Sequence, residues 1–329
     1  MANYVGLING IKANNFIIVG RVGMDFFTHP SEATEEAEEM MVGMGGSSAN
    51  IGAGICKLGG NAALVTRVSD DSVGRYCVGQ LAKYGVDTTH VTPIGGEYRT
   101  SLAVYESRLE DHQTVIYRNG AADFQMDDSD VDAVDYAQYG ALITAGTVFA
   151  AEPSRTATFK AFELAKAAGL PIIFDVDYRP YSWPSPQVAE EVLTRAAEQS
   201  DMIVGNDEEF GFMAGGIDKG LAKARALSDT SAAMVVYKMG HKGAITFANG
   251  EEIRTGIYPV DAMKPTGAGD SFMAGLVTSI AAGHELKTSI LRGSACASVT
   301  VSRPGCAPAM ADTETLENFL AKHSGPTAA

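Results

Sequence analysis

Short apolar runs recur along the chain, separated by stretches with the composition of helices. The apolar runs occupy residues 16–20, 62–66, 141–145, 172–177, 202–205 and 234–238. The helical stretches include residues 47–58, 153–168, 186–198, 267–282, 285–302 and 313–322. Buried strands that alternate with helices predict a mostly parallel sheet with helices on both faces, which is a Rossmann-like α/β fold.

Two segments interrupt this alternation. Residues 100–106 and 113–118 alternate around the polar stretch 108–112, which predicts a hairpin outside the parallel sheet. The acidic residues 31–39 lead into residues 40–44, which we expect to add a strand to the same small sheet. We therefore expect a β-sheet lid over the carboxyl edge of the main sheet. The predicted lid comprises residues 28–45 and 97–120, and the predicted α/β core comprises residues 14–27, 46–96 and 121–322.

The composition excludes several classes of protein. Of the 329 residues, 46% are hydrophobic and 20% are charged, which is typical of a folded chain. A formal net charge of −15 argues against a broad surface for nucleic acid or for an anionic membrane. The first residues do not have the pattern of an export signal, and no apolar run is long enough to span a bilayer. The four cysteines have no C-x-x-C spacing and the six histidines no i, i+4 pair, so we expect a cytoplasmic protein with reduced thiols and no helical metal site.

The segment KPTGAGDSF at residues 264–272 carries the most chemistry. Gly267, Ala268 and Gly269 open an apolar helix and leave its first N–H groups unshielded, which predicts an anion site. Asp270 stands beside that site, where a carboxylate repels a phosphate unless it caps the helix or takes a proton. In phosphoryl transfer the acceptor hydroxyl needs a base and the γ-phosphate needs donors, and this turn offers both. The alternative is a helix cap with glycines for tight packing.

A second glycine-rich segment, GGSSAN, opens the predicted helix at residues 47–58. Gly45 and Gly46 permit close approach to a polyol, and Asn50 offers a donor and an acceptor to its hydroxyls. Ser47 and Ser48 are candidate helix caps. The alternative is a loop that only leads into a capped helix.

Further polar residues stand at the ends of predicted strands, where α/β proteins bind ligands. Asp25 follows the first strand. Asn206 and Glu209 follow another and suit a triphosphate with water-bound Mg²⁺, or else cap the next helix. The glycine turn after Lys238 either faces phosphates or is an ordinary hairpin turn.

Taken together, these segments resemble, in order and over nearly the whole chain, the ribokinase-like (PfkB) carbohydrate kinase family. The resemblance implies a Rossmann-like domain with a β-sheet lid and Mg²⁺- and ATP-dependent phosphorylation of a hydroxymethyl group. It implies Asp270 as the base and Gly267, Ala268 and Gly269 as the anion hole. The implied sugar contacts are Asp25, Gly45, Gly46 and Asn50. The implied nucleotide contacts are Asn206, Glu209, Lys238, Gly240, Gly243 and Thr266, with Glu209 acting on the metal through water.

A narrower resemblance lies in DYRPYSW at residues 177–183 and YRNGAA at residues 117–122. These strings are similar to the bacterial 5-dehydro-2-deoxygluconokinases of inositol breakdown and, more loosely, to 2-keto-3-deoxygluconate kinases. Arg118 and Arg179 are then candidates for the substrate carboxylate, because guanidinium groups match planar acids. Arg179 has two alternatives: pairing with Asp175 or Asp177, or reaching an ATP phosphate. The expected substrate is 5-dehydro-2-deoxy-D-gluconate. The alternatives are 2-keto-3-deoxygluconate or a neutral sugar of the ribokinase or fructokinase type.

Lys264 departs from the family pattern. Many members of the family that the chain resembles carry Asp at this position, where it helps to hold a monovalent cation. A lysine replaces that carboxylate with a positive charge, so activation by potassium is not expected. The resemblance also leads us to expect a homodimer formed through the lid, with ATP and an acid sugar as the only other partners.

Three other functions fit the residues less well. An NAD-dependent oxidoreductase should carry G-x-G-x-x-G after its first strand, where this chain reads GRVG at residues 20–23. A non-catalytic sugar-binding regulator is expected to lack the base, whereas Asp270 is present. A nucleoside kinase has no use for two arginines beside an uncharged substrate.

Overall fold

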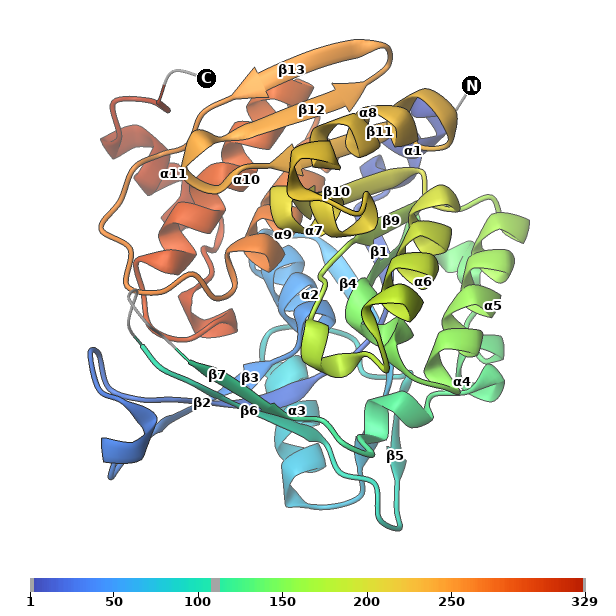
Figure 1. The fold of residues 1–329 in the computed structure, drawn as a ribbon, viewed down its shortest axis with the longest axis vertical. Coiled ribbons are helices and arrows are strands. Elements are labelled where there is room, and N and C mark those ends of the chain that lie inside the picture. Colours follow the sequence, from blue (N-terminus) through green and yellow to red (C-terminus); the bar gives the residue numbers. More distant parts are fainter. Residues whose placement is uncertain (1–2, 108–112, 328–329) are drawn as a thin grey trace.

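The computed structural model describes residues 3–107 and 113–327. Figure 1 shows a large twisted sheet covered by helices, with a smaller sheet beneath it. The large sheet has nine strands in the order β13-β12-β11-β10-β9-β8-β1-β4-β5. Its strands are β1 (Asn15–Val19), β4 (Asn61–Ser69), β5 (Val91–Ile94), β8 (Ala141–Ala145), β9 (Ile172–Asp175), β10 (Met202–Asn206), β11 (Met234–Lys238), β12 (Ala244–Ala248) and β13 (Glu251–Thr255). The pairs of β11 with β12 and of β12 with β13 are antiparallel and the other pairs are parallel, so the predicted mostly parallel sheet is confirmed.

Helices cover both faces of this sheet. Ile17 and Val19 of β1 pack into one apolar cluster, and Phe16 and Ile18 pack into the other. The first cluster includes residues of α4 (Asp128–Asp132), α5 (Ser154–Ala167), α6 (Pro186–Glu198), α7 (Asp207–Met213) and α8 (Gly220–Thr230). The second includes residues of α1 (Tyr4–Lys12), α2 (Ser47–Lys57), α3 (Ser72–Lys83), α9 (Ala268–Ala281) and α10 (Leu286–Val301). Burial on both faces explains why the central strands read as continuous apolar runs.

The chain ends in α11 (Thr313–Lys322), as the sequence predicts. The pattern of apolar residues did not predict α1, β5, β12 or β13. Most residues of β5 and β13 are exposed or only partly buried, so these two strands lack the continuous apolar runs of the central strands. Within the described residues, every helix is too short or too polar to cross a membrane.

The smaller sheet has the order β3-β2-β6-β7. Its strands are β2 (Gly23–Phe27), β3 (Met41–Gly45), β6 (Ser101–Tyr105) and β7 (Thr114–Tyr117). The predicted hairpin is present as the antiparallel pair of β6 and β7, and the connection at residues 108–112 lies outside the described residues. The strand expected within residues 40–44 is β3.

One boundary differs from the sequence analysis. Residues 23–27 were assigned to the core, but as β2 they pair with β3 and β6 of the smaller sheet. Buried and partly exposed residues alternate along β2, which is the pattern of a sheet that is buried on one face. The neighbouring β1 is buried on both faces, so the change of pattern marks where the chain leaves the core.

Candidate active site

A cavity of about 1020 Å³ is lined by residues from the main sheet and from the smaller sheet. Asp175, Asn206 and Lys238 stand at the carboxyl ends of three neighbouring strands on one side. Tyr105 and Ile116 come from β6 and β7 of the smaller sheet, which therefore forms the lid of the cavity. A cleft at the carboxyl ends of parallel strands is the usual place for a ligand in such folds.

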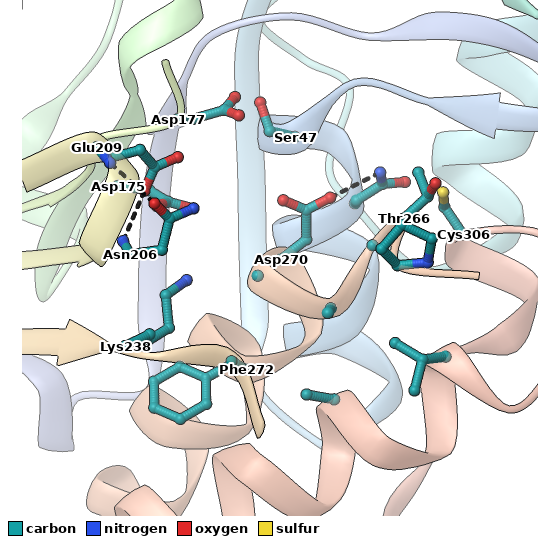
Figure 2. Close-up of a pocket in the computed structure, with 18 of the residues that line it drawn as sticks. Ser47, Asp175, Asp177, Asn206, Glu209, Lys238, Thr266, Asp270, Phe272 and Cys306 are labelled. Carbon is teal, nitrogen blue, oxygen red and sulfur yellow. Dashed lines mark hydrogen bonds between the residues drawn. The ribbon is translucent and has the colours of Figure 1, made fainter. Parts of the chain in front are cut away.

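Nearly all of the residues that the sequence singled out line this one cavity, and Figure 2 shows several of them around it. They are Gly46, Asn50, Arg118, Arg179, Asn206, Glu209, Lys238, Gly240, Gly243, Thr266, Gly267, Ala268, Gly269 and Asp270. The structure thus brings together motifs that are far apart in the sequence.

Asp25 and Gly45 do not line the cavity. Asp25 is buried on β2, and a Cβ added to Gly45 would lie 1.9 Å from Oδ1 of Asp25, so the carboxyl group lies directly against Gly45. Burial raises the pKa of Asp25 to about 7, although Arg21 opposes the shift. Near neutral pH this carboxyl group is therefore only partly ionised.

Asp270 does not cap its helix. The N-cap of α9 is Gly267, which has a φ of 81° and lies in the left-handed region that favours glycine. The first backbone hydrogen bond runs from Ser271 N to Gly267 O, which leaves the N–H groups of Ala268 and Gly269 available to an anion. The cap alternative for Asp270 is therefore wrong.

The carboxylate of Asp270 instead accepts a hydrogen bond of 2.9 Å from Nδ2 of Asn50 on α2. Burial raises the pKa of Asp270 to about 6, and the charge of Asp177 adds to the shift. The hydrogen bond from Asn50 and the charges of Arg179 and Lys238 oppose it. Asp270 is therefore a carboxylate that is ionised at neutral pH yet takes up a proton readily.

The start of α2 is built differently from the prediction. Its N-cap is Gly46, with a φ of 97°, and neither Ser47 nor Ser48 caps the helix. A Cβ on Gly46 would lie 2.7 Å from the backbone oxygen of Arg21, so glycine is needed where these two segments cross. This crossing holds the connection between β1 and β2 against the start of α2.

Asn206 and Glu209 do cap the following helix, as one alternative expected. Asn206 Oδ1 accepts from Glu209 N at 2.9 Å, and Glu209 Oε2 accepts from Asn206 N at 2.8 Å. Burial raises the pKa values of Glu209 and Asp175, and the charge of Lys238 opposes both shifts. This side of the cavity therefore favours a cation close to its two carboxyl groups.

In residues 3–107 and 113–327, no group of three or more His, Cys, Asp and Glu side chains is arranged to hold a metal.

Gly240 and Gly243 line the cavity beside Lys238, at the turn of the β11–β12 hairpin. The turn is therefore a hairpin turn that also lines the cavity, and its contact with phosphates stays a prediction.

Both predicted arginines already have acidic partners. Arg118 donates to Asp123 in a close ion pair and to Thr147 O at 2.9 Å, and it packs over the ring of Phe124. Arg179 pairs with Asp177 at 2.8 Å, and its side chain is 46% exposed. Of the alternatives for Arg179, the structure shows the pairing with Asp177.

Lys264 is a buried cation beside the anion turn. The residue is 3% exposed, and its Nζ donates to Thr266 O at 2.7 Å and to Thr300 O at 3.3 Å. Burial lowers its pKa, and Asp270 is one of two groups that oppose the shift. The ammonium group ties the turn before α9 to the end of α10.

Several cavity residues were not predicted. They include Arg21, Ser47, Tyr105, Thr147, Asp175, Asp177, Tyr181, Glu208 and Cys306, together with residues 255–260 and parts of α10. Most of them carry no local motif, and they reach the cavity only because distant segments fold together. Arg21 stands four residues before Asp25 and was regarded only as part of a strand end.

The chain is similar in sequence to known carbohydrate kinases over nearly its whole length. The model of the pfkB family carbohydrate kinases matches residues 14–313. A 5-dehydro-2-deoxygluconokinase of Photobacterium profundum is 34% identical over 311 residues, covering 92% of this chain and 94% of the relative. One of Geobacillus kaustophilus is 34% identical over 326 residues, covering 97% of each chain.

Solved structures share the fold. A PfkB protein from Polaromonas sp. JS666 has a TM-score of 0.79 at 25% identity, covering 89% of this chain and 98% of its own. A fructokinase from Xylella fastidiosa, solved with bound ATP, has a TM-score of 0.83 at 18% identity, covering 94% of this chain and 98% of its own. The ribokinase-like architecture of a large sheet with a small lid is therefore confirmed.

Proposed function

The chain belongs to the pfkB family of carbohydrate kinases, and we propose that it transfers the γ-phosphoryl group of ATP to a hydroxymethyl group of an acid sugar. The proposed substrate is 5-dehydro-2-deoxy-D-gluconate, the acid sugar of the kinases that it resembles over nearly its whole length. The observation that carries the proposal is one cavity that combines Asp270, an open helix N-terminus and buried guanidinium groups.

Asp270 is the proposed base. Its carboxylate is held by Asn50 and is ionised at neutral pH, so it can accept the proton of the attacking hydroxyl. The N–H groups of Ala268 and Gly269, beside Gly267, are proposed to stabilise the charge on the transferred phosphoryl group. Base and donors then act at adjacent positions on one helix end.

The remaining residues divide between the two substrates. The proposed nucleotide contacts are Asn206, Glu209, Lys238, Gly240, Gly243 and Thr266. Mg²⁺ bound to ATP would neutralise part of the triphosphate charge, with Glu209 acting on it through water. The proposed sugar contacts are Gly46, Asn50, Arg118 and Arg179, with Asp25 and Gly45 on the lid beside them. A cytoplasmic location is proposed as well, because the four cysteines are free thiols.

Asp270→Asn is expected to lower turnover by roughly 10²- to 10⁴-fold, the usual contribution of a general base, with little change in ATP affinity. In the parent enzyme, kcat/KM for the sugar is expected to fall as the pH drops below about 6, because protonated Asp270 is not a base. The variant should lose this limb of the pH profile. Turnover close to that of the parent, measured where chemistry limits the rate, would show that Asp270 is not the base.

Substrate choice is tested by ADP release from purified protein with acid sugars, neutral hexoses, pentoses and nucleosides. We expect the highest kcat/KM for 5-dehydro-2-deoxy-D-gluconate. Arg179→Ala and Arg118→Ala should lower the value for the acid sugar far more than for a neutral sugar, with KM for ATP followed in parallel. Equal losses on both sugars would contradict carboxylate selection, and a change only in KM for ATP would assign Arg179 to the nucleotide.

Activity is expected to require Mg²⁺ but to change little when Na⁺ replaces K⁺ at constant ionic strength. The reason is the ammonium group of Lys264, which already supplies a positive charge to the backbone oxygens beside the anion turn. Lys264→Asp removes that charge and is expected to increase the response to K⁺. A several-fold specific activation of the parent enzyme by K⁺ would contradict this role for Lys264.

The outer face of the lid is proposed to form a homodimer. Register and alternation place one set of apolar side chains on the face opposite Asp25 and Tyr105. Met24 and Met44 on this face pack against the second apolar cluster of the core. The others are Phe26, Val42, Leu102, Val104, Val115 and Tyr117. Val42 is 42% exposed, Val115 43% and Tyr117 62%, and an apolar face of this kind typically marks an interface.

Sedimentation equilibrium at micromolar concentration is expected to give twice the chain mass of 34.5 kDa. Val115→Glu should shift the protein towards the monomer, because the charge would be buried without a partner. Asp218→Lys, an exposed change away from the lid, is the control and should leave the dimer intact. A parent protein that sediments as a monomer would contradict the proposed interface.

A further inference from the structure

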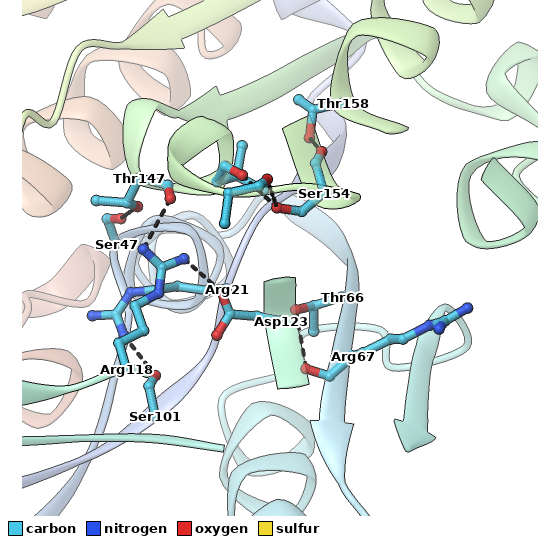
Figure 3. A network of polar contacts seen from close by, with 12 residues as sticks. Arg21, Ser47, Thr66, Arg67, Ser101, Arg118, Asp123, Thr147, Ser154 and Thr158 are labelled. Atoms are coloured by element: carbon cyan, nitrogen blue, oxygen red, sulfur yellow. Dashed lines mark hydrogen bonds and ion pairs between the residues drawn. The ribbon is translucent and has the colours of Figure 1, made fainter. Parts of the chain in front are cut away.

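Arg21 reaches from the core to the lid inside the cavity. It lies between β1 and β2, and its backbone oxygen accepts from Ala49 N at 3.2 Å, which fixes the residue to the start of α2. Its side chain donates from Nη1 to Ser101 Oγ on β6 at 2.7 Å, and the residue is 7% exposed. Figure 3 shows its guanidinium group next to that of Arg118.

Arg21 forms no ion pair among the described residues, whereas Arg118 and Arg179 each do. Arg118 pairs with Asp123 and Arg179 pairs with Asp177. Within residues 3–107 and 113–327, Arg21 has no carboxylate oxygen within 4.0 Å, and the one hydrogen-bond partner of its side chain is the hydroxyl of Ser101. A guanidinium group carries five N–H donors, and burying it without a counter-charge costs free energy unless a ligand supplies one.

Burial lowers the pKa of Arg21, but the charges of Asp123, Tyr105, Asp25 and Asp177 outweigh this effect and raise it, so acidic groups beyond ion-pair distance stabilise the buried guanidinium group. Arg118 adds a positive charge beside it. Burial lowers the pKa of Arg118, and the charge of Arg21 adds to this shift, which places the two guanidinium groups within electrostatic reach of each other. In the part of the chain that the structure describes, only the carboxylate of Asp123 lies in an ion pair with either of them. Asp25 is the next acidic group on this side, and its pKa of about 7 leaves it only partly ionised at neutral pH.

We propose that Arg21 is the residue that binds the carboxylate of the sugar, with Ser101 and the Arg118–Asp123 pair holding it in position. The inference rests on the proposed function, since it requires an acid sugar as substrate. A planar guanidinium group with a free edge binds a carboxylate through two parallel hydrogen bonds. Arg118 directs both Nη1 and Nη2 to protein acceptors, and its Nε is buried without a partner, whereas Arg21 directs only Nη1 to a protein acceptor and has the more available edge.

This assignment places the acid group of the substrate at the lid. Arg21 contacts β6, whose Tyr105 also lines the cavity, whereas the proposed nucleotide residues follow β10 and β11. Figure 1 shows the lid strands and the β11–β12 hairpin at opposite ends of the molecule. An acid sugar held by Arg21 at one end then directs its far hydroxymethyl group towards Asp270.

The test compares two substrates that differ only in charge: 5-dehydro-2-deoxy-D-gluconate and its carboxamide. Arg21→Met removes the charge at similar volume and is expected to lower kcat/KM for the acid by about ten- to a hundredfold, the scale of one lost charge-assisted contact. The loss on the carboxamide should be small, and KM for ATP should not change. Arg21→Lys keeps the charge without the planar fork and should lie between the parent and Arg21→Met.

Ser101→Ala removes the hydrogen bond that positions the Arg21 side chain but keeps the charge, so it should lower kcat/KM for the acid more than for the carboxamide, and by less than Arg21→Met does. Arg254→Met, the same change at an exposed arginine of β13 that does not line the cavity, is the matched control and should affect neither substrate. Equal losses on the acid and the carboxamide in Arg21→Met would show that Arg21 only ties the lid to the core and would overturn the inference. The inference would also be overturned if Arg21→Lys, chosen in case the Met variant does not fold, retains the full preference for the acid.

The result for the parent enzyme separates the proposed kinase function from the proposed role of Arg21. A parent enzyme that prefers the acid over the carboxamide supports the proposed function, whichever way the Arg21 variants behave. A parent enzyme that uses both substrates equally, or neither, contradicts the proposed function and this inference with it.

Discussion

The close packing of α2 against α9 is the contact on which the site depends. A Cβ on Gly54 of α2 would lie 2.7 Å from the Cβ of Ala274 on α9, so only the smallest residue fits at this crossing. The two helix starts then lie side by side, and Asn50 donates to Asp270 across 220 positions of sequence. The base, the anion turn and the proposed sugar contacts Gly46 and Asn50 are therefore placed by a single helix pair, and the other contacts are arranged around them.

Burial of ionisable side chains shifts the pKa values of the acidic groups in the cavity. The pKa of Asp270 rises to about 6 because the group is removed from water, while Asn50, Arg179 and Lys238 keep it ionised at neutral pH. The same burial raises the pKa values of Asp175 and Glu209, which favours a cation near them. Acidic and basic groups meet at both sides of the cavity: Lys238 acts on Asp175 and Glu209 near the strand ends, and Arg118 pairs with Asp123 near the lid.

The sequence predicted the parts of the fold and site that depend on local patterns. Continuous apolar runs mark strands buried on both faces, and the GAGD turn marks an open helix start whatever surrounds it. Partners that depend on tertiary packing were not predictable. Asp123 sits in a short turn after the lid, and nothing near it in the sequence shows that it pairs with Arg118. Arg21 likewise becomes a cavity residue only because β2 leaves the core for the lid.

The most direct test of the account is the identity of the product formed from ATP, Mg²⁺ and 5-dehydro-2-deoxy-D-gluconate by the purified protein. Phosphorus NMR with proton coupling identifies the carbon that bears the new phosphate ester. The account predicts one phosphate monoester on a CH₂ group, formed in equal amount to ADP, with the carboxylate unchanged. A phosphate ester on a secondary carbon, or ADP formed with inorganic phosphate alone, would contradict it.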